Sequence, residues 1–493
     1  MSKLKICMVS SEAGPYARTG GLGDVLASLP LALSRRGYDV SVVLPLYGSI
    51  DRGRYQIAAT GHTVRVPIGG RDVTGTLHVA RSTRHNARYY FLENDTFFKR
   101  PEYYRDPATG GDYTDNDQRF AFLARGAIEA VKHLNWAPDV MHVHDWQAAL
   151  VPAYLRTVYD VDSFFAHTKT VLTIHNLGYQ GMFGPERFDA LGLPHHQMYA
   201  VSGPLEFFGQ MNFLKGGIAL ADKVTTVSER YAEEIQSTEE FGFGLQGILS
   251  SRSDDLHGIL NGVDYSLWSP SRDKLIPHKF TTSNLSGKKT GRVELMNKAG
   301  LPIRNKVPLI GMITRLTDQK GVDLICDGGD QLFRRDIQMV ILGVGDDHYH
   351  QRLKDLERDY PDKLKVFLEF NDILAHWIQS GVDMFLMPSR YEPCGLNQMY
   401  ALRYGSVPIV RSTGGLADTV EDYNPETKTG TGFVFERYSI PDMLGAIDRA
   451  VTAFQRRQSW IKLMKAGMAR DFSWDRSAEK YAALYQSIAE PAP

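Results

Sequence analysis

Short apolar runs alternate with segments of helical periodicity along the whole chain. After Gly20-Gly21, five apolar residues recur at the spacing of one helix face, namely Leu22, Val25, Leu26, Leu29 and Leu33. Apolar runs in the first half predict strands at 4–10, 40–44, 140–143, 170–174, 223–227 and 257–260. Runs in the second half predict strands at 309–313, 339–342, 365–368, 384–387 and 407–410. This succession of strand, loop and helix is typical of an α/β protein with parallel sheets.

A polar stretch interrupts the pattern at 269–292 and has no apolar period. We therefore expect a first domain over 1–268, a linker over 269–292 and a second domain over 293–470. The terminal segment 471–493 contains a helix that should cap the structure, because Tyr481, Leu484 and Tyr485 share one face. Ligand loops follow the carboxyl ends of parallel strands, so loops of both domains are expected to face one central cleft.

Composition excludes several classes of function. At 493 residues with 43% hydrophobic and 23% charged residues, the chain has material for two or three globular domains. A net charge of -1 gives no footprint for nucleic acid or an acidic membrane, so we expect neither as a partner. The three cysteines lack metal-ligand spacing, and no long apolar segment opens the chain or could span a bilayer. A cytoplasmic protein is expected.

The stretch MFLMPSRYEPCGLNQMYALRYGSVPIVRSTGGLADTV, residues 384–420, carries the strongest chemical signal. Glu392 follows a predicted strand and precedes a helix, where a carboxylate suits sugar hydroxyls. Thr413-Gly414-Gly415 opens the next helix, where bare backbone N–H groups suit a phosphate. Either feature alone is more often turn chemistry or a complement to the helix dipole. Together they predict a site for a sugar joined to a diphosphate.

Cations occur in two further loops. Arg315 and Lys320 follow a predicted strand in the second half, and they can converge on a leaving diphosphate. Arg18 precedes Gly20-Gly21 at a helix start, which makes this loop a second candidate phosphate contact. The segment 94–114 is polar and aromatic and is expected to be a long functional loop.

Polar residues follow two more strands of the first half. The sequence His142-Val143-His144-Asp145-Trp146 places two histidines on one side of a strand, but no third metal ligand is evident, so no metal site is predicted. Asp145 and His175 stand at strand ends, where side chains are well placed to meet a substrate.

These motifs, in this order, resemble bacterial glycogen synthase and plant starch synthase over nearly the whole chain. The motifs that carry the resemblance are Arg18 to Leu22, His142 to Trp146, His175 to Leu177, Asn261 to Asp264, Arg315 to Gly321, Pro388 to Leu396 and Ser412 to Leu416. The resemblance implies two Rossmann-like domains of the GT-B type. It also implies transfer of glucose from ADP-glucose to the non-reducing end of an α-1,4-glucan, such as glycogen, with retention and without a cofactor.

The resemblance also implies roles for individual residues. Arg315 and Lys320 would bind the donor diphosphate, and Glu392 the glucosyl hydroxyls. His175 would lie near the reacting carbon and Asp145 on the acceptor side. Thr413, Gly414 and Gly415 would hold phosphate, and Tyr104 would stack on adenine. The family usually has Lys at the position of Arg18, which leaves UDP-glucose open as an alternative donor.

Two other functions fit the same architecture. A sugar-nucleotide epimerase or hydrolase would consume the donor without an acceptor. A non-catalytic glucan-binding protein would bind polysaccharide without turnover. No pair of carboxylates with an evident nucleophile emerges, which favours front-face transfer assisted by the departing phosphate over a covalent glycosyl-enzyme.

Overall fold

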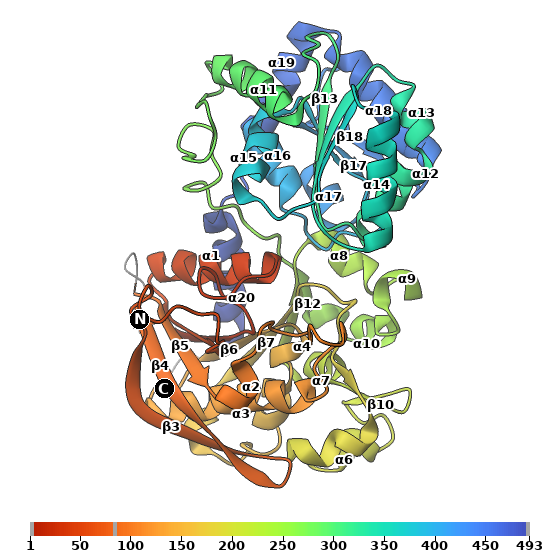
Figure 1. Ribbon diagram of the computed structural model, residues 1–493. Helices are drawn as coiled ribbons and strands as arrows, with labels where there is room; N and C mark the ends of the chain where they lie inside the picture. The colour runs from red at the N-terminus through yellow and green to blue at the C-terminus, as the bar shows by residue number, and fades with distance from the viewer. Residues whose placement is uncertain (1–3, 82–85, 490–493) are drawn as a thin grey trace. The chain divides into compact units, whose positions relative to one another are not determined.

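The computed structural model describes residues 4–81 and 86–489, which form two compact α/β units (Figure 1). Of the described residues, the first contains 4–81, 86–227, 232–259 and 474–489, and the second contains 228–231 and 260–473. The division near residue 260 lies before the predicted linker, and the final helix α20 (Trp474–Ile488) belongs to the first unit.

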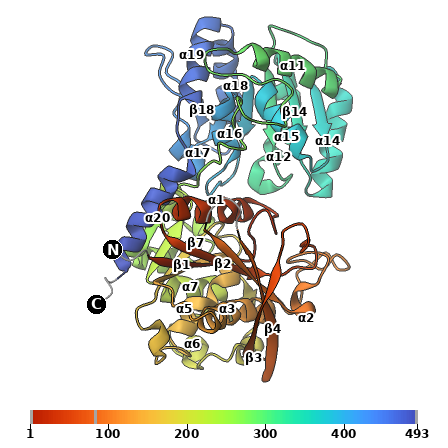
Figure 2. The same cartoon turned by 90° about the vertical axis from the view of Figure 1, so that its left-hand side faces the viewer.

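The first unit is built on a nine-stranded sheet in the order β12-β11-β7-β6-β1-β2-β5-β4-β3. Helices α1 and α20 lie on one side of this sheet in Figure 2, and α3, α5 and α7 lie on the other. The strands are β1 (Lys5–Val9), β2 (Asp39–Pro45), β3 (Ala58–Ile68), β4 (Arg71–Arg81), β5 (Arg88–Glu93), β6 (Val140–His144), β7 (Lys169–Ile174), β11 (Lys223–Thr226) and β12 (Leu256–Gly258). The helices are α1 (Gly21–Arg35), α3 (Asn116–His133), α5 (Leu150–Leu155) and α7 (Phe213–Leu220).

The antiparallel edge of this sheet, β3 with β4, is absent from the expected strands. Exposed Thr63, Arg65 and Pro67 alternate with buried residues, so β3 does not show as a continuous apolar run. Gly69 and Gly70, with φ of +61° and +73°, form the tight turn between the two strands.

The second unit has a six-stranded parallel sheet in the order β15-β14-β13-β16-β17-β18. Alternate strand residues feed two cores, one on each face: Ile310 packs with α12 to α14, α18 and α19, and Leu309 packs with α11 and α15 to α17. The strands are β13 (Leu309–Ile313), β14 (Gln338–Leu342), β15 (Leu364–Phe367), β16 (Met384–Met387), β17 (Val407–Arg411) and β18 (Phe433–Phe435). The helices are α11 (Ser286–Ala299), α12 (Val322–Asp327), α13 (Gly329–Phe333), α14 (Asp347–Asp359), α15 (Asp372–Gly381), α16 (Asn397–Tyr404), α17 (Gly414–Thr419), α18 (Ile440–Phe454) and α19 (Arg457–Met468).

The polar stretch 269–292 is part of the second unit, and α11 begins inside it at Ser286. Lys288 is buried and donates to the Ser380 carbonyl at 3.0 Å and to Ser406 Oγ at 2.8 Å. Arg292 is also buried and pairs with Asp383 at 2.9 Å. These polar side chains are buried and have hydrogen-bond or ion-pair partners inside the protein. A polar composition therefore did not mark an exposed linker at this stretch.

Candidate functional site

Loops after neighbouring strands β13, β16 and β17 are tied together at the carboxyl edge of the second sheet. The backbone N–H of Arg390 donates to the Gln319 carbonyl at 2.9 Å. Gly321, with φ of +71°, lies so close to Pro388 that a Cβ there would be 2.1 Å from its carbonyl oxygen. The loop that carries Lys320 is thereby fixed against the loop that carries Glu392.

Lys320 and Glu392 form an ion pair inside this loop cluster. Lys320 Nζ lies 2.6 Å from Glu392 Oε2 and 2.9 Å from Oε1, and Ser389 Oγ donates to Oε2 at 3.0 Å. The Glu392 side chain is 7% exposed and that of Lys320 is 16% exposed. A carboxylate with this little water around it needs such partners, so Lys320 and Ser389 fix the direction of the Glu392 side chain.

Gly414 and Gly415 bring α17 against the same loop, which corrects the expectation of an open N–H group at Gly415. The Gly415 N–H donates to the carbonyl oxygens of Glu392 at 3.1 Å and Pro393 at 3.3 Å. A Cβ on Gly414 would lie 2.0 Å from the Glu392 oxygen, and one on Gly415 would lie 2.0 Å from the Cys394 oxygen. These two glycines therefore hold α17 against the Glu392 loop, and the Gly415 N–H is not open to a phosphate.

Arg315 stands at the end of β13 and is exposed. Within the described ranges 4–81 and 86–489, its side chain makes no ion pair or hydrogen bond. It is therefore a cation at the rim of the loop cluster that is available to an anionic ligand.

The first unit gathers a second group of predicted residues at the ends of β1, β6 and β7, which are neighbours in the sheet. Its centre is Glu12, a residue to which no motif in the sequence points. Glu12 is 3% exposed and accepts hydrogen bonds at 2.6 Å from the backbone N–H and the hydroxyl of Thr19 and from the hydroxyl of Tyr104. Tyr104 belongs to the segment 94–114, which was expected to be a long functional loop. This segment begins with a short helix, α2 (Asp95–Phe98).

Arg18 and the first Gly-Gly pair lie on the loop that Glu12 holds. Arg18 Nε pairs with Asp24 at 2.7 Å, and the Arg18 side chain is 46% exposed. A Cβ added to Gly20 or Gly21 would meet nothing within 4 Å. In contrast to the tightly packed pair at 414–415, the start of α1 faces open space that a ligand can reach.

Asp145 and His175 meet through the backbone. Asp145 has a φ of +55°, a left-handed conformation that is uncommon away from glycine. Its Oδ1 accepts the His175 N–H at 2.7 Å. Burial raises the pKa of Asp145 from 3.8 to about 7, against the opposing effect of the two backbone N–H donors at His175 and Asn176.

The histidines are linked to one another and to α20. His144 Nδ1 and His175 Nε2 are 3.0 Å apart, and His142 contacts the hydroxyls of Tyr485 at 2.7 Å and Thr173 at 2.6 Å. Burial lowers the pKa of His142 and of His175 to about 3, so both rings are neutral at pH 7. His142 thus anchors the terminal helix, and His175 is left as a neutral ring beside Asp145.

Asp145→Asn should change the pH dependence of stability. Because the pKa of Asp145 is higher in the folded chain than the usual 3.8, its favourable contribution is present below pH 4 and is lost as pH rises to about 7. The free energy of unfolding of the variant should therefore rise relative to that of the wild type between pH 4 and 7. Above pH 7 the difference between the two should stay constant. Urea titrations at several pH values measure this.

Asp162→Asn is the control of opposite sign, because hydrogen bonds from Lys132 and the Phe164 N–H lower the pKa of Asp162. Its loss of stability relative to wild type should be full above pH 4 and should disappear at lower pH. A wild-type curve parallel to that of Asp145→Asn would contradict the assignment for Asp145.

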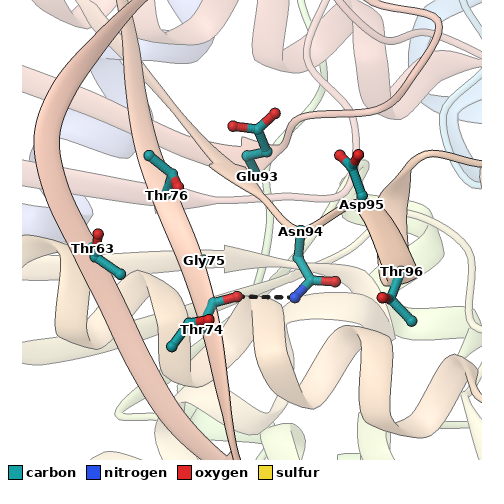
Figure 3. Close-up of a pocket in the computed structure, with 8 residues that line it drawn as sticks. All are labelled: Thr63, Thr74, Gly75, Thr76, Glu93, Asn94, Asp95 and Thr96. Atoms are coloured by element: carbon teal, nitrogen blue, oxygen red, sulfur yellow. Dashed lines mark hydrogen bonds between the residues drawn. The ribbon is translucent and has the colours of Figure 1, made fainter.

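A surface hollow of the described residues lies apart from the two groups of predicted site residues. A polar hollow of about 360 Å³ lies on β3, β4 and the residues after β5, where Asn94 Nδ2 donates to the Thr74 carbonyl at 2.9 Å (Figure 3). It contains none of the predicted site residues. Among residues 4–81 and 86–489, no three His, Cys, Asp or Glu side chains are grouped to hold a metal, and no helix is long and apolar enough to cross a membrane.

Comparison with known proteins agrees with this geometry. Residues 5–251 match the family model "Starch synthase catalytic domain" and residues 295–466 match "Glycosyl transferases group 1". The chain is 45% identical to a glycogen synthase of Koribacter versatilis over 98% of both chains, and 42% identical to one of Thermotoga maritima over 98% of both. The chain belongs to the glycogen and starch synthase family.

The fold of this chain is also similar to the folds of solved structures. The catalytic domain of starch synthase IV from Arabidopsis thaliana, bound to ADP and acarbose, superposes with a TM-score of 0.89 at 31% identity, covering 99% of this chain and 100% of that one. Sucrose-phosphate synthase from Thermosynechococcus elongatus shares the fold, with a TM-score of 0.58 at 16% identity and 99% coverage of both chains. The expected glycosyltransferase class with two Rossmann-like units of the GT-B type is thus confirmed.

Proposed function

We propose that this enzyme transfers glucose from ADP-glucose to the non-reducing end of an α-1,4-glucan, with retention at the anomeric carbon and release of ADP. The observation that carries the proposal is the Lys320–Glu392 pair beside exposed Arg315, which combines a sugar-binding carboxylate with cations for a diphosphate. Relatives named glycogen synthase and a starch synthase bound to ADP and acarbose support both the donor and the glucan acceptor.

The donor half of the proposal rests on the second unit. Arg315 and Lys320 bind the two phosphates, and Glu392 accepts hydrogen bonds from glucosyl hydroxyls. Lys320 can serve both groups, because an ammonium has three N–H donors and Glu392 takes two of them. Gly414 and Gly415 seat α17 against the Glu392 loop, and a phosphate contact at Thr413 and Gly414 remains a prediction.

The first unit supplies the remaining contacts. Asp145 and His175 meet the acceptor and the reacting sugar, and the open start of α1 at Gly20-Gly21 receives donor phosphate with Arg18 beside it. Tyr104 is proposed to face the adenine ring, with its hydroxyl fixed on Glu12 at 2.6 Å.

Front-face transfer, in which no carboxylate attacks the sugar, agrees with the surroundings of Glu392 and Asp145. Glu392 is engaged by Lys320, and Asp145 has a pKa raised to about 7 and accepts backbone N–H groups, so neither is a free ionised nucleophile. The acceptor oxygen bonds to the anomeric carbon while the bond to phosphate breaks. ADP takes the bonding electrons, and its phosphate oxygen accepts the hydroxyl proton. Arg315 and Lys320 stabilise the charge that develops there.

A donor comparison tests the proposal. Labelled ADP-glucose and UDP-glucose are each supplied with and without a glycogen primer, to the wild type and to Arg18→Lys. We expect labelled polymer from ADP-glucose only when primer is present. Release of nucleotide without primer would favour an epimerase or hydrolase, and binding without any turnover would favour a glucan-binding protein. A cytoplasmic location remains a prediction from the sequence.

A further inference from the structure

A small sheet in the first unit presents exposed apolar side chains. It consists of β8 (Met182–Phe183), β10 (Gln210–Asn212) and β9 (Glu206–Phe207), in that order. Phe208 at its tip is 85% exposed, Met182 is 45% exposed, and Tyr179 just before the sheet is 52% exposed. Three large exposed apolar side chains on or next to one small sheet point to a ligand that covers them.

The backbone at Phe208 makes this exposure more unusual. Phe208 and Gly209, with φ of +49° and +80°, form the two-residue turn between β9 and β10. Turns with two positive φ values favour Asn-Gly, and a bulky side chain in the first position is strained. The Gly209 N–H donates to Glu206 Oε1 at 2.8 Å, which fixes the turn. Strain of this kind is concentrated at ligand-binding positions.

The small sheet packs against Trp146, the residue that follows Asp145. Gly181 lies so close to the Trp146 ring that a Cβ there would be 2.3 Å from it, and the rings of Phe183 and Trp146 have centroids 5.9 Å apart. In Figure 1, β10 lies in the same region of the first unit as α7 and α4, the short helix (Asp145–Ala148) that begins at Asp145. The small sheet with exposed Tyr179, Met182 and Phe208, which we call the platform, is therefore continuous with the part of the first unit that carries Asp145 and His175.

We propose that Phe208 is a glucan-stacking residue that binds a glucose ring of the acceptor chain several units from its reacting end. The inference rests on the proposed function and deepens it. A glucose ring has an apolar face of C–H groups that packs on an aromatic ring, and a neutral polymer needs no charged partner. Tyr179, which is 52% exposed and lies four residues after His175 in the sequence, offers a second exposed aromatic surface. Phe208 then sets the preference for long acceptors over short ones.

Phe208→Asn is the variant of choice, because asparagine suits the turn and should leave the fold at least as stable. We expect its KM for glycogen to rise about five- to tenfold, the size of one lost aromatic contact, while its rate with maltotriose stays at the wild-type value. Its retardation in native gels that contain glycogen should fall in parallel. Val161→Asn, which removes a side chain that is 95% exposed in the same unit, should change none of these.

The outcomes separate the inference from the function on which it rests. Wild-type transfer to both acceptors, with equal glycogen retardation of Phe208→Asn and wild type, overturns the stacking role alone. Failure of the wild type to extend either acceptor overturns the proposed function and the stacking role with it. A wild-type dimer in light scattering that Phe208→Asn dissociates would show that a second copy covers the platform, and would also overturn the inference.

Discussion

Glu392→Gln should lower kcat for glucosyl transfer about a hundredfold or more, the size typical of losing one preorganised electrostatic contact. The substitution keeps the shape of the side chain but removes the charge that Lys320 and Ser389 orient. An amide is a weaker acceptor for sugar hydroxyls than a carboxylate. It also leaves the Lys320 ammonium, which is 16% exposed, without its counterion. Initial rates with saturating donor and primer measure the effect.

Lys320→Met tests the same pair from the other side. If the two residues act as a unit, the double variant should be little worse than the more damaging single variant, because the effects of coupled residues do not add. Glu357→Gln is the matched control in the same unit, since Glu357 pairs with Lys365 at the same distance of 2.6 Å outside the loop cluster. Wild-type turnover by Glu392→Gln would remove Glu392 from the site.

All strands of the second unit except β18 were predictable, because both faces of its parallel sheet are covered. β13 and β16 coincide with the expected runs at 309–313 and 384–387, since a strand buried on both faces contains a continuous apolar run. The buried strand β5 was also missed. β3 and β4 were missed for the opposite reason, because in the second half of β3 buried residues alternate with exposed ones. Their Gly69-Gly70 turn was the available signal.

The candidate site was partly predictable from local motifs. Glu392 and Lys320 stand in loops after apolar strands, but their pairing joins positions 72 residues apart, which spacing does not reveal. Glu12 carries no local motif, and its role depends on Tyr104, 92 residues away. The sequence also gives the two Gly-Gly pairs the same appearance. Only the packing around them distinguishes the open start of α1 from the filled start of α17.

The role of Gly415 yields the second large prediction. Gly415→Ala should lower both activity and stability, because the new methyl group would lie 2.0 Å from the Cys394 carbonyl oxygen and 2.6 Å from its Cα. These are backbone atoms, so relief requires α17 or the Glu392 loop to move. Overpacking of this kind typically costs about 1–3 kcal/mol, and displacement of Glu392 by about 1 Å can cost a hundredfold in rate.

Gly445→Ala is the matched control for this substitution. Gly445 lies in α18 of the same unit, and an added Cβ would meet nothing within 4 Å. Alanine there should raise the free energy of unfolding by about 0.5–1 kcal/mol and leave the rate unchanged. Thermal unfolding and initial rates of both variants, measured side by side, separate close packing at α17 from the general effect of removing a glycine. If Gly415→Ala behaved like Gly445→Ala, the glycine would not be what seats α17 against the Glu392 loop, and a direct role in ligand binding would have to be sought for it instead.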